Sequence, residues 1–232
     1  SGVCPEVWIL ENREILIRLQ EEYVKAGSHI LYAPTFSANR IKLDEYGLKE
    51  KQREMILELV GLSRQAAGDR AFVAGDLTMT GEQLAPIGTL KLEELIDIYK
   101  EQIGYLVEAG VDLLVVETMM SLQETRAALI AAKETCDLPV LVTMTFESDG
   151  RTLYGTDALT AAVVLSSLGA DAVGLNCSTG PDKMVELIRS MAQAVKVPVI
   201  AKPNAGLPFV DGEGRTCYDM DAAAFTEYMG AL

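Results

Sequence analysis

The sequence of 232 residues contains a single histidine, His29, only four cysteines, and few aromatic residues (6%). His29 opens an apolar run and so lies at the amino end of a predicted strand, whereas chemistry in parallel α/β folds gathers at the carboxyl ends. A hydrolase built on a Ser–His–Asp or Cys–His arrangement is therefore disfavoured. Cys4, Cys136, Cys177 and Cys217 are too sparse and irregular for a disulfide framework, which indicates a reducing, cytoplasmic location.

Other absences exclude further classes. No apolar run approaches the roughly 18 residues of a membrane-spanning helix, and no secretory signal is visible at Ser1. The nucleotide-binding motifs GxGxxG and GxxxxGK[ST] are missing, so the α/β folds that use them lose support. The 34 acidic and 20 basic side chains give a net charge of −14. Because such a surface repels phosphate backbones and anionic lipids, neither nucleic acid nor a membrane is an expected partner.

The sequence does contain a regular alternation of short β-branched runs with longer amphipathic stretches. The short runs are apolar without strict alternation, as expected for strands buried on both faces of a parallel sheet. The six predicted strands are residues 29–34, 71–76, 111–117, 139–146, 171–177 and 197–204. In the helix predicted before the first of them, the apolar stripe consists of Leu16, Leu19, Tyr23 and Ala26.

Strict alternation of strand and helix predicts a parallel sheet with right-handed crossovers. An eight-stranded barrel and an open doubly wound sheet both fit this pattern. Only six strands are found, since a helix follows Cys4–Pro5 directly and a helical pattern fills residues 219–232. We therefore predict an α/β protein with a TIM-like (β/α)8 barrel that lacks its first and last strands. Residues 1–232 would form one domain, incomplete at both ends.

Polar residues stand at the carboxyl end of every predicted strand. Each of them alone could cap a helix or bond within a loop. Their recurrence over six units favours a shared pocket, because the carboxyl ends of parallel strands converge. These residues are Thr35, Asp76, Glu117, Thr118, Thr143, Thr145, Asn176, Cys177, Lys202 and Asn204.

Glu117 and Cys177 are the most informative of these residues. Glu117 ends an otherwise apolar strand, and burying an unpaired charge is costly, so it needs a cation. That cation is either a loop residue such as Arg151 or a substrate ammonium, and the second is favoured. Cys177 lies beside a Gly turn and a predicted helix start, an environment that favours thiolates. A lone cysteine is more often a small hydrophobe, and zinc needs at least three protein ligands.

Five segments at these strand ends resemble the homocysteine S-methyltransferases, in that family's order and over nearly the whole chain. They are PTFSANRIKLDEYGL (34–48), LLVVETM (113–119), TFESDGRTLYGT (145–156), GLNCSTGP (174–181) and KPNAGLP (202–208). The CPE start and the NRIKLDEYGL string most resemble the homocysteine-binding module of cobalamin-dependent methionine synthase. The resemblance implies zinc-dependent transfer of a methyl group to the thiol of homocysteine, giving methionine.

The resemblance also implies roles for individual residues. The family binds zinc through three cysteines, and Cys177 matches the first of them. The other two belong to a GGCCGT string that is absent here, as is the DGAMGT-like turn of the family's first strand. Glu117 matches the residue that binds the substrate amino group. Thr35, Asn176 and Asn204 match positions that line the same pocket, although LYAPTF replaces the family's ETNTF-like residues around Thr35.

Methylcobalamin, carried by another module, would be the methyl donor. The implied partners are thus homocysteine and cobalamin- and folate-binding modules or proteins, and no corrin site is assigned to this chain. Three alternatives remain open. The same fold could use betaine or S-methylmethionine as donor, or the chain could be a partial, non-catalytic barrel domain. Lys202 could instead form the Schiff base of an aldolase, although an ion pair at the barrel mouth explains it better.

Overall fold

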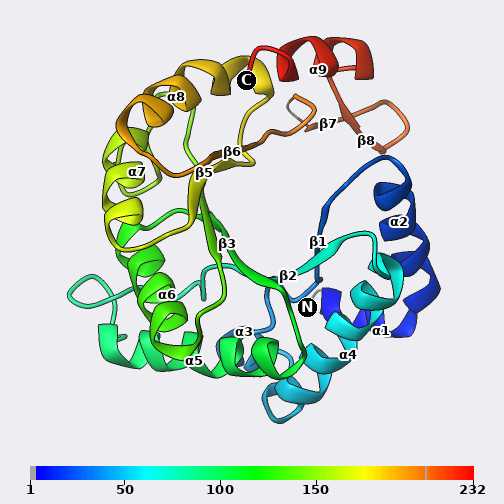
Figure 1. Cartoon of the computed structure of the whole chain (residues 1–232), viewed down its shortest axis with the longest axis vertical. Helices are drawn as coiled ribbons and strands as arrows, with labels where there is room; N and C mark the ends of the chain where they lie inside the picture. Colours follow the sequence, from blue (N-terminus) through cyan, green and yellow to red (C-terminus); the bar gives the residue numbers. More distant parts are fainter. Residues whose placement is uncertain (1–3, 207) are drawn as a thin grey trace. The chain divides into compact units, whose positions relative to one another are not determined.

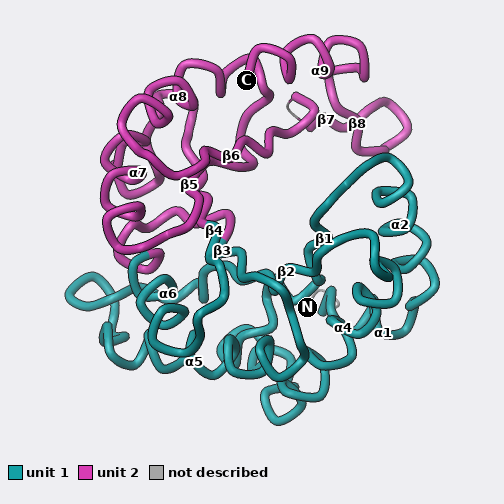
Figure 2. Tube along the Cα trace, in the orientation of Figure 1, with its two compact units in different colours: residues 1–116, 126–141 teal, residues 117–125, 142–232 magenta. Residues whose placement is uncertain are grey.

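The computed structural model describes residues 4–206 and 208–232, coloured along the sequence in Figure 1. The chain divides into two compact units, shown in Figure 2. The first unit comprises residues 1–116 and 126–141, and the second comprises residues 117–125 and 142–232. The prediction that residues 1–232 form one domain stays a prediction.

All six strands predicted from the sequence are present. They are β1 (Ile30–Tyr32), β2 (Phe72–Leu77), β3 (Leu113–Met119), β4 (Val140–Met144), β5 (Ala172–Asn176) and β6 (Val199–Lys202). They follow one another in the sheet in chain order, and the pairs β1–β2, β2–β3 and β5–β6 are parallel. Within the described residues this sheet has six strands rather than eight. The predicted α/β class with a partial set of barrel strands is confirmed.

The first unit carries most of the helices that precede β4. These are α1 (Pro5–Glu11), α2 (Arg13–Lys25), α3 (Arg40–Asp44), the short 3-10 helix η1 (Lys49–Lys51), α4 (Gln52–Ala67), α5 (Leu92–Glu108) and the greater part of α6 (Leu122–Thr135). Helices α4 and α5 bury aliphatic stripes, among them Ile56, Leu59, Ile103 and Leu106. Across residues 4–206 and 208–232, no helix is both long enough and apolar enough to cross a membrane.

The buried stripe of α2 differs from the predicted one. Leu19 and Tyr23 are 54% and 57% exposed, and the buried residues are Ile17, Gln20 and Val24. The amide of Gln20 explains the rotation, because its Nε2 donates to the carbonyl of Tyr32 at 2.9 Å. This hydrogen bond satisfies the Tyr32 carbonyl and accompanies the inward position of Gln20.

The second unit holds the carboxyl ends of β3 and β4 and everything after them. Its helices are α7 (Ala158–Ser167), α8 (Pro181–Ala194) and α9 (Ala222–Met229). Helix α7 starts at an N-cap, where the Asp157 carboxylate accepts from the Thr160 N–H at 2.8 Å. Strands β5 and β6 approach closely at Gly174, where a Cβ atom would lie 2.0 Å from the Ile200 carbonyl oxygen.

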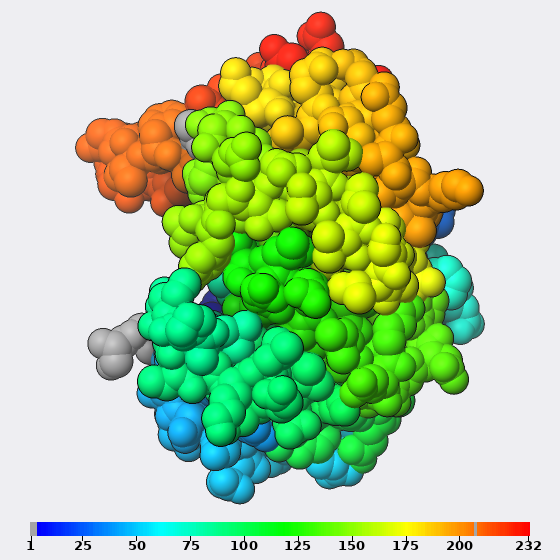
Figure 3. Space-filling view, turned by 90° about the vertical axis from the view of Figure 1, so that its left-hand side faces the viewer, coloured from blue at the N-terminus to red at the C-terminus, as the bar shows by residue number. Residues whose placement is uncertain are grey.

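An antiparallel hairpin of β7 (Pro208–Val210) and β8 (Thr216–Tyr218) follows β6. It is orange in Figure 3, where it projects from the rest of the second unit. The hairpin lies outside the six strands predicted from the sequence. Its turn is closed by Asp211, whose Oδ1 accepts from the N–H groups of Glu213 and Arg215, both at 2.9 Å. The sequence signal for this hairpin is the turn-forming run Asp-Gly-Glu-Gly at 211–214, which lies between two short segments with β-branched and aromatic residues, 209–210 and 216–218.

Candidate functional site

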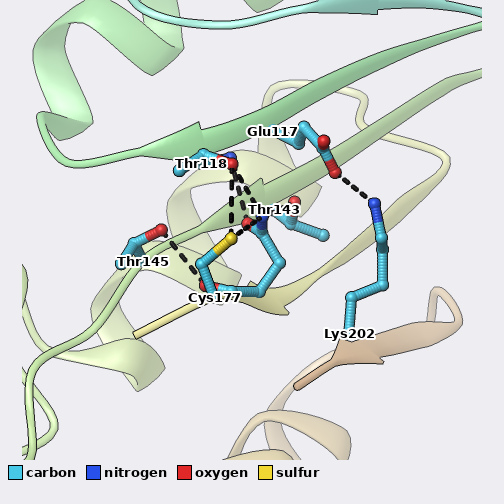
Figure 4. A network of polar contacts seen from close by, with 7 residues as sticks. Glu117, Thr118, Thr143, Thr145, Cys177 and Lys202 are labelled. Atoms are coloured by element: carbon cyan, nitrogen blue, oxygen red, sulfur yellow. Dashed lines mark hydrogen bonds and ion pairs between the residues drawn. The ribbon is translucent and has the colours of Figure 1, made fainter. Parts of the chain in front are cut away.

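The carboxyl ends of β3, β4, β5 and β6 bring a group of polar side chains together within the second unit (Figure 4). Asn176, at the end of β5, lies at the centre of this group and is 2% exposed. Its Oδ1 accepts from the Thr118 N–H at 3.0 Å and from the Thr143 hydroxyl at 2.9 Å. Its Nδ2 donates to Thr118 Oγ1 at 2.7 Å and contacts Cys177 Sγ at 3.3 Å. Asn176 therefore links the ends of three strands and holds the cysteine beside it.

The backbone at these strand ends is in an unusual conformation. Thr118, Cys177 and Ser178 have φ values of +58°, +61° and +61°. Residues with a Cβ atom seldom adopt this left-handed region, and such strain is concentrated at functional sites. The conformation of Cys177 is held by its N–H, which donates to the Lys202 carbonyl at 3.1 Å. Cys177 Sγ consequently lies 3.9 Å from Thr118 Oγ1.

Glu117 forms an ion pair with Lys202 at the end of β6. The Glu117 side chain is 12% exposed and the Lys202 side chain is 40% exposed. The lysine thus supplies the cation that a buried carboxylate at this strand end requires. The alternative partner considered from the sequence, Arg151, donates instead to the Gly155 carbonyl at 2.8 Å. The interpretation of Lys202 as an ion-pair partner is confirmed.

A cleft of about 480 Å³ opens beside Cys177 in the same unit. It is lined by the turn that follows Cys177, by the start of α8, and by residues near Gly206 and Asp219. Asn204 lies next to this turn, because its N–H donates to the Thr179 carbonyl at 3.0 Å. The predicted pocket residues Asn176 and Asn204 therefore accompany Glu117 and Cys177 in one compact unit. The volume of the cleft is in the range of small-molecule sites, and its lining begins at Ser178, the residue after Cys177.

Thr35 lies in the first unit, in a separate buried polar cluster. Its hydroxyl donates to the Asp76 carbonyl at 2.9 Å and accepts from the Asp76 N–H at 3.1 Å. Its own carbonyl accepts from Gln102 Nε2 at 3.0 Å. The hydroxyl of Thr35 thereby ties β1 to β2, and its role in substrate binding stays a prediction. His29 is exposed at the amino end of β1, as the sequence predicted.

The cysteines other than Cys177 form local contacts. The Cys4 thiol donates to Glu6 Oε2 at 3.2 Å, and burial raises its pKa. Cys136 bonds to a carbonyl one turn back in α6, and Cys217 bonds to Asp211 in the hairpin. In the part of the chain that the structure describes, no three His, Cys, Asp or Glu residues form a cluster that could hold a metal. The role of Cys177 as a zinc ligand stays a prediction.

Comparison with known proteins gives this geometry a context. The family model described as homocysteine S-methyltransferase matches residues 3–232. The chain belongs to the homocysteine S-methyltransferase family. Two methionine synthases, from Mycobacterium leprae and Mycobacterium tuberculosis, are 28% and 27% identical to this homocysteine S-methyltransferase family member over 222 residues. The matched region covers 91% of this chain but only 18% of each methionine synthase.

The fold of this family member also matches solved structures of the homocysteine methyltransferase MmuM from Escherichia coli. The metallated form has a TM-score of 0.75 at 19% identity and covers 89% of this chain and 78% of its own. The oxidized form has a TM-score of 0.80 at 18% identity and covers 100% of this chain and 81% of its own. This likeness confirms the TIM-like barrel fold predicted from the sequence.

Proposed function

We propose that this chain transfers a methyl group to the thiol of homocysteine, giving methionine, as the homocysteine-binding module of a cobalamin-dependent methionine synthase. In this proposal residues 1–232 form one (β/α) barrel domain that lacks the first and last barrel strands. The carrying observation is the strand-end site of the second unit, where the Cys177 thiol contacts Thr118 and Asn176, and Glu117, the residue before Thr118, forms an ion pair with Lys202. The methionine synthases at 27–28% identity support this assignment over other methyl donors.

Glu117 binds the amino group of homocysteine in this proposal. Its side chain is only 12% exposed, and burial of a charged group is costly unless a cation lies beside it. A substrate ammonium meets that requirement. Asn176, Asn204 and Thr35 are the further pocket residues, and Asn176 acts mainly by holding the backbone that carries Glu117 and Cys177. Such positioning of the reacting thiol is a large part of what an active site supplies.

Cys177 is the residue of this chain that would ligate zinc. Two further thiolates are needed, and the family's adjacent cysteine pair is absent from these 232 residues. Zinc held by thiolates would favour the deprotonated, nucleophilic form of a substrate thiol. The hydrogen bond from Asn176 Nδ2 and the backbone bond to Lys202 fix the direction of the Cys177 sulfur. Methylcobalamin would be presented by another module, so cobalamin- and folate-binding modules are the proposed partners in the cytoplasm.

A partial, non-catalytic barrel domain is the second candidate function. It is favoured by one observation, the lack of a three-residue metal cluster among residues 4–206 and 208–232. Zinc content separates it from the first candidate. The zinc of the purified protein is measured by elemental analysis, and methyl transfer is assayed with methylcobalamin, betaine and S-methylmethionine. About one zinc per chain together with transfer from methylcobalamin supports the proposed module. Transfer from betaine or S-methylmethionine alone would replace the donor, and absence of both zinc and transfer favours the non-catalytic domain.

Two substitutions test the assignments of individual residues. Cys177→Ala should abolish zinc retention and turnover, whereas Cys136→Ala, which removes a half-buried cysteine at the end of α6, should do neither. Full zinc occupancy in Cys177→Ala refutes the ligand assignment. Glu117→Gln should weaken homocysteine binding by about 10- to 100-fold while sparing zinc, since a charge-assisted hydrogen bond is lost. Unchanged affinity in that variant counts against the role of Glu117.

A further inference from the structure

The ion pair of Glu117 and Lys202 lies inside the candidate site. Lys202 pairs in register with Asn176 across the β5–β6 ladder, and its carbonyl accepts from the Cys177 N–H at 3.1 Å. Lys202 therefore contributes to the site twice: its backbone carbonyl holds Cys177, and its side chain neutralises Glu117. One positive and one negative side chain thus lie within the candidate site.

The two partners of this ion pair differ in how easily they can move. The Glu117 side chain is 12% exposed and short, whereas the Lys202 side chain is 40% exposed and has a flexible four-carbon stem. An incoming cation can therefore displace the lysine from the carboxylate, while the carboxylate stays in place. Because a buried carboxylate is costly without a cation beside it, the incoming ammonium would take the place of the lysine.

We propose that Lys202 determines specificity by binding the carboxylate of the amino-acid substrate, after the substrate ammonium has taken its place on Glu117. This inference rests on the proposed function. An α-amino acid brings one charge of each sign to a site that offers one of each sign. After the exchange the ammonium lies on Glu117 and the carboxylate lies on Lys202, so no charge is left unpaired and no covalent bond changes.

This arrangement selects for zwitterions. A thiol that carries only an amine displaces Lys202 from Glu117 and offers the lysine no carboxylate in exchange. A thiol that carries only a carboxylate meets a lysine that is still paired with Glu117. If Lys202 serves only as the counter-ion of Glu117, its removal should tighten homocysteine binding, because the substrate ammonium would no longer compete with the lysine for Glu117. The direction of the change in affinity therefore distinguishes the two roles.

The test is calorimetric titration of the full-length, zinc-loaded protein with three thiols. These are L-homocysteine, 3-amino-1-propanethiol, which lacks the carboxylate, and 4-sulfanylbutanoate, which lacks the ammonium. Lys202→Met should weaken homocysteine binding by about 10- to 100-fold, the loss of one charge-assisted hydrogen bond. It should weaken 4-sulfanylbutanoate less, because the lysine of the wild type is still paired with Glu117 when this thiol binds. The same variant should bind 3-amino-1-propanethiol as well as the wild type or better. Lys202→Arg should restore most of the affinity for homocysteine.

A matched control removes a lysine elsewhere in the same unit. Lys196→Met removes the same charge from an exposed position between α8 and β6, at the amino end of β6, and should bind all three thiols as the wild type does. Lys202→Met also leaves Glu117 buried without its cation, which can impair folding. Comparison of the double variant Glu117→Gln/Lys202→Met with Glu117→Gln avoids this problem, because neither protein contains the buried carboxylate. The double variant should bind 4-sulfanylbutanoate more weakly than Glu117→Gln does.

Two results overturn the assignment of Lys202. Homocysteine binding that is unchanged or tighter in Lys202→Met shows that the lysine only competes for Glu117. Equal weakening of the thiol that lacks a carboxylate shows that Lys202 does not recognise this group. A wild-type protein that binds none of the three thiols overturns the proposed function and this inference with it. Normal wild-type binding with either adverse result removes the Lys202 assignment alone.

Discussion

Replacement of Asn176 by leucine tests the view that one buried amide organises the strand ends. The two side chains are similar in size, so Asn176→Leu removes the hydrogen bonds without opening a large cavity. Two donors lose their acceptor, the Thr118 N–H and the Thr143 hydroxyl, and Thr143 is fully buried. The Thr118 hydroxyl also loses the donor of its 2.7 Å bond.

The expected cost follows from these contacts. A buried donor left unsatisfied costs about 1–3 kcal/mol, so two of them should lower the free energy of unfolding by about 2–6 kcal/mol. Thr143→Val is the matched control, because it removes one donor while Asn176 Oδ1 still accepts from the Thr118 N–H. A single hydrogen bond of this kind contributes only about 0.5–1.5 kcal/mol.

Urea denaturation, followed by circular dichroism at neutral pH, measures both variants against the wild type. Asn176→Leu should lose at least twice as much stability as Thr143→Val. If the leucine variant proves as stable as the valine variant, Asn176 does not hold the positive-φ backbone of Thr118 and Cys177. The account of the site as one connected network would then be wrong.

Three further predictions concern other parts of the chain. The Thr160 backbone N–H lowers the pKa of Asp157, so this cap stabilises α7 above about pH 4 and the stabilisation is lost in acid. In denaturation experiments, Asp157→Ala should lower the free energy of unfolding by about 1 kcal/mol at pH 7 and by less below pH 4. Asp157→Asn, which keeps a capping oxygen, should cost little. Gly174→Ala should cost about 1–3 kcal/mol or more, because the new Cβ meets the Ile200 carbonyl at 2.0 Å; a variant that melts with the wild type contradicts the close approach of β5 and β6. His29→Ala should leave methyl transfer nearly intact, since His29 is exposed at the amino end of β1, and a large loss of turnover in a folded variant contradicts the placement of the site.

Much of the secondary structure and part of the site could be predicted from local features. Apolar runs identified all six strands of the main sheet, because burial on both faces demands such runs whatever they pair with. Polar residues at strand ends identified Glu117, Asn176 and Cys177, since carboxyl ends of neighbouring parallel strands converge. The hairpin of β7 and β8 was missed, because its strands are three residues long and carry little periodicity.

The sequence by itself determined the alternation of strands and helices and the residue types at the strand ends, because both are local consequences of burial and chain geometry. Only the tertiary structure decided which groups meet. Lys202 neutralises Glu117 across 85 positions of chain, and Gln20 rather than Leu19 faces inward to reach a carbonyl of β1. Partners of this kind depend on which strands become neighbours and on which buried polar groups would otherwise lack a hydrogen bond. No periodicity within a single segment carries that information.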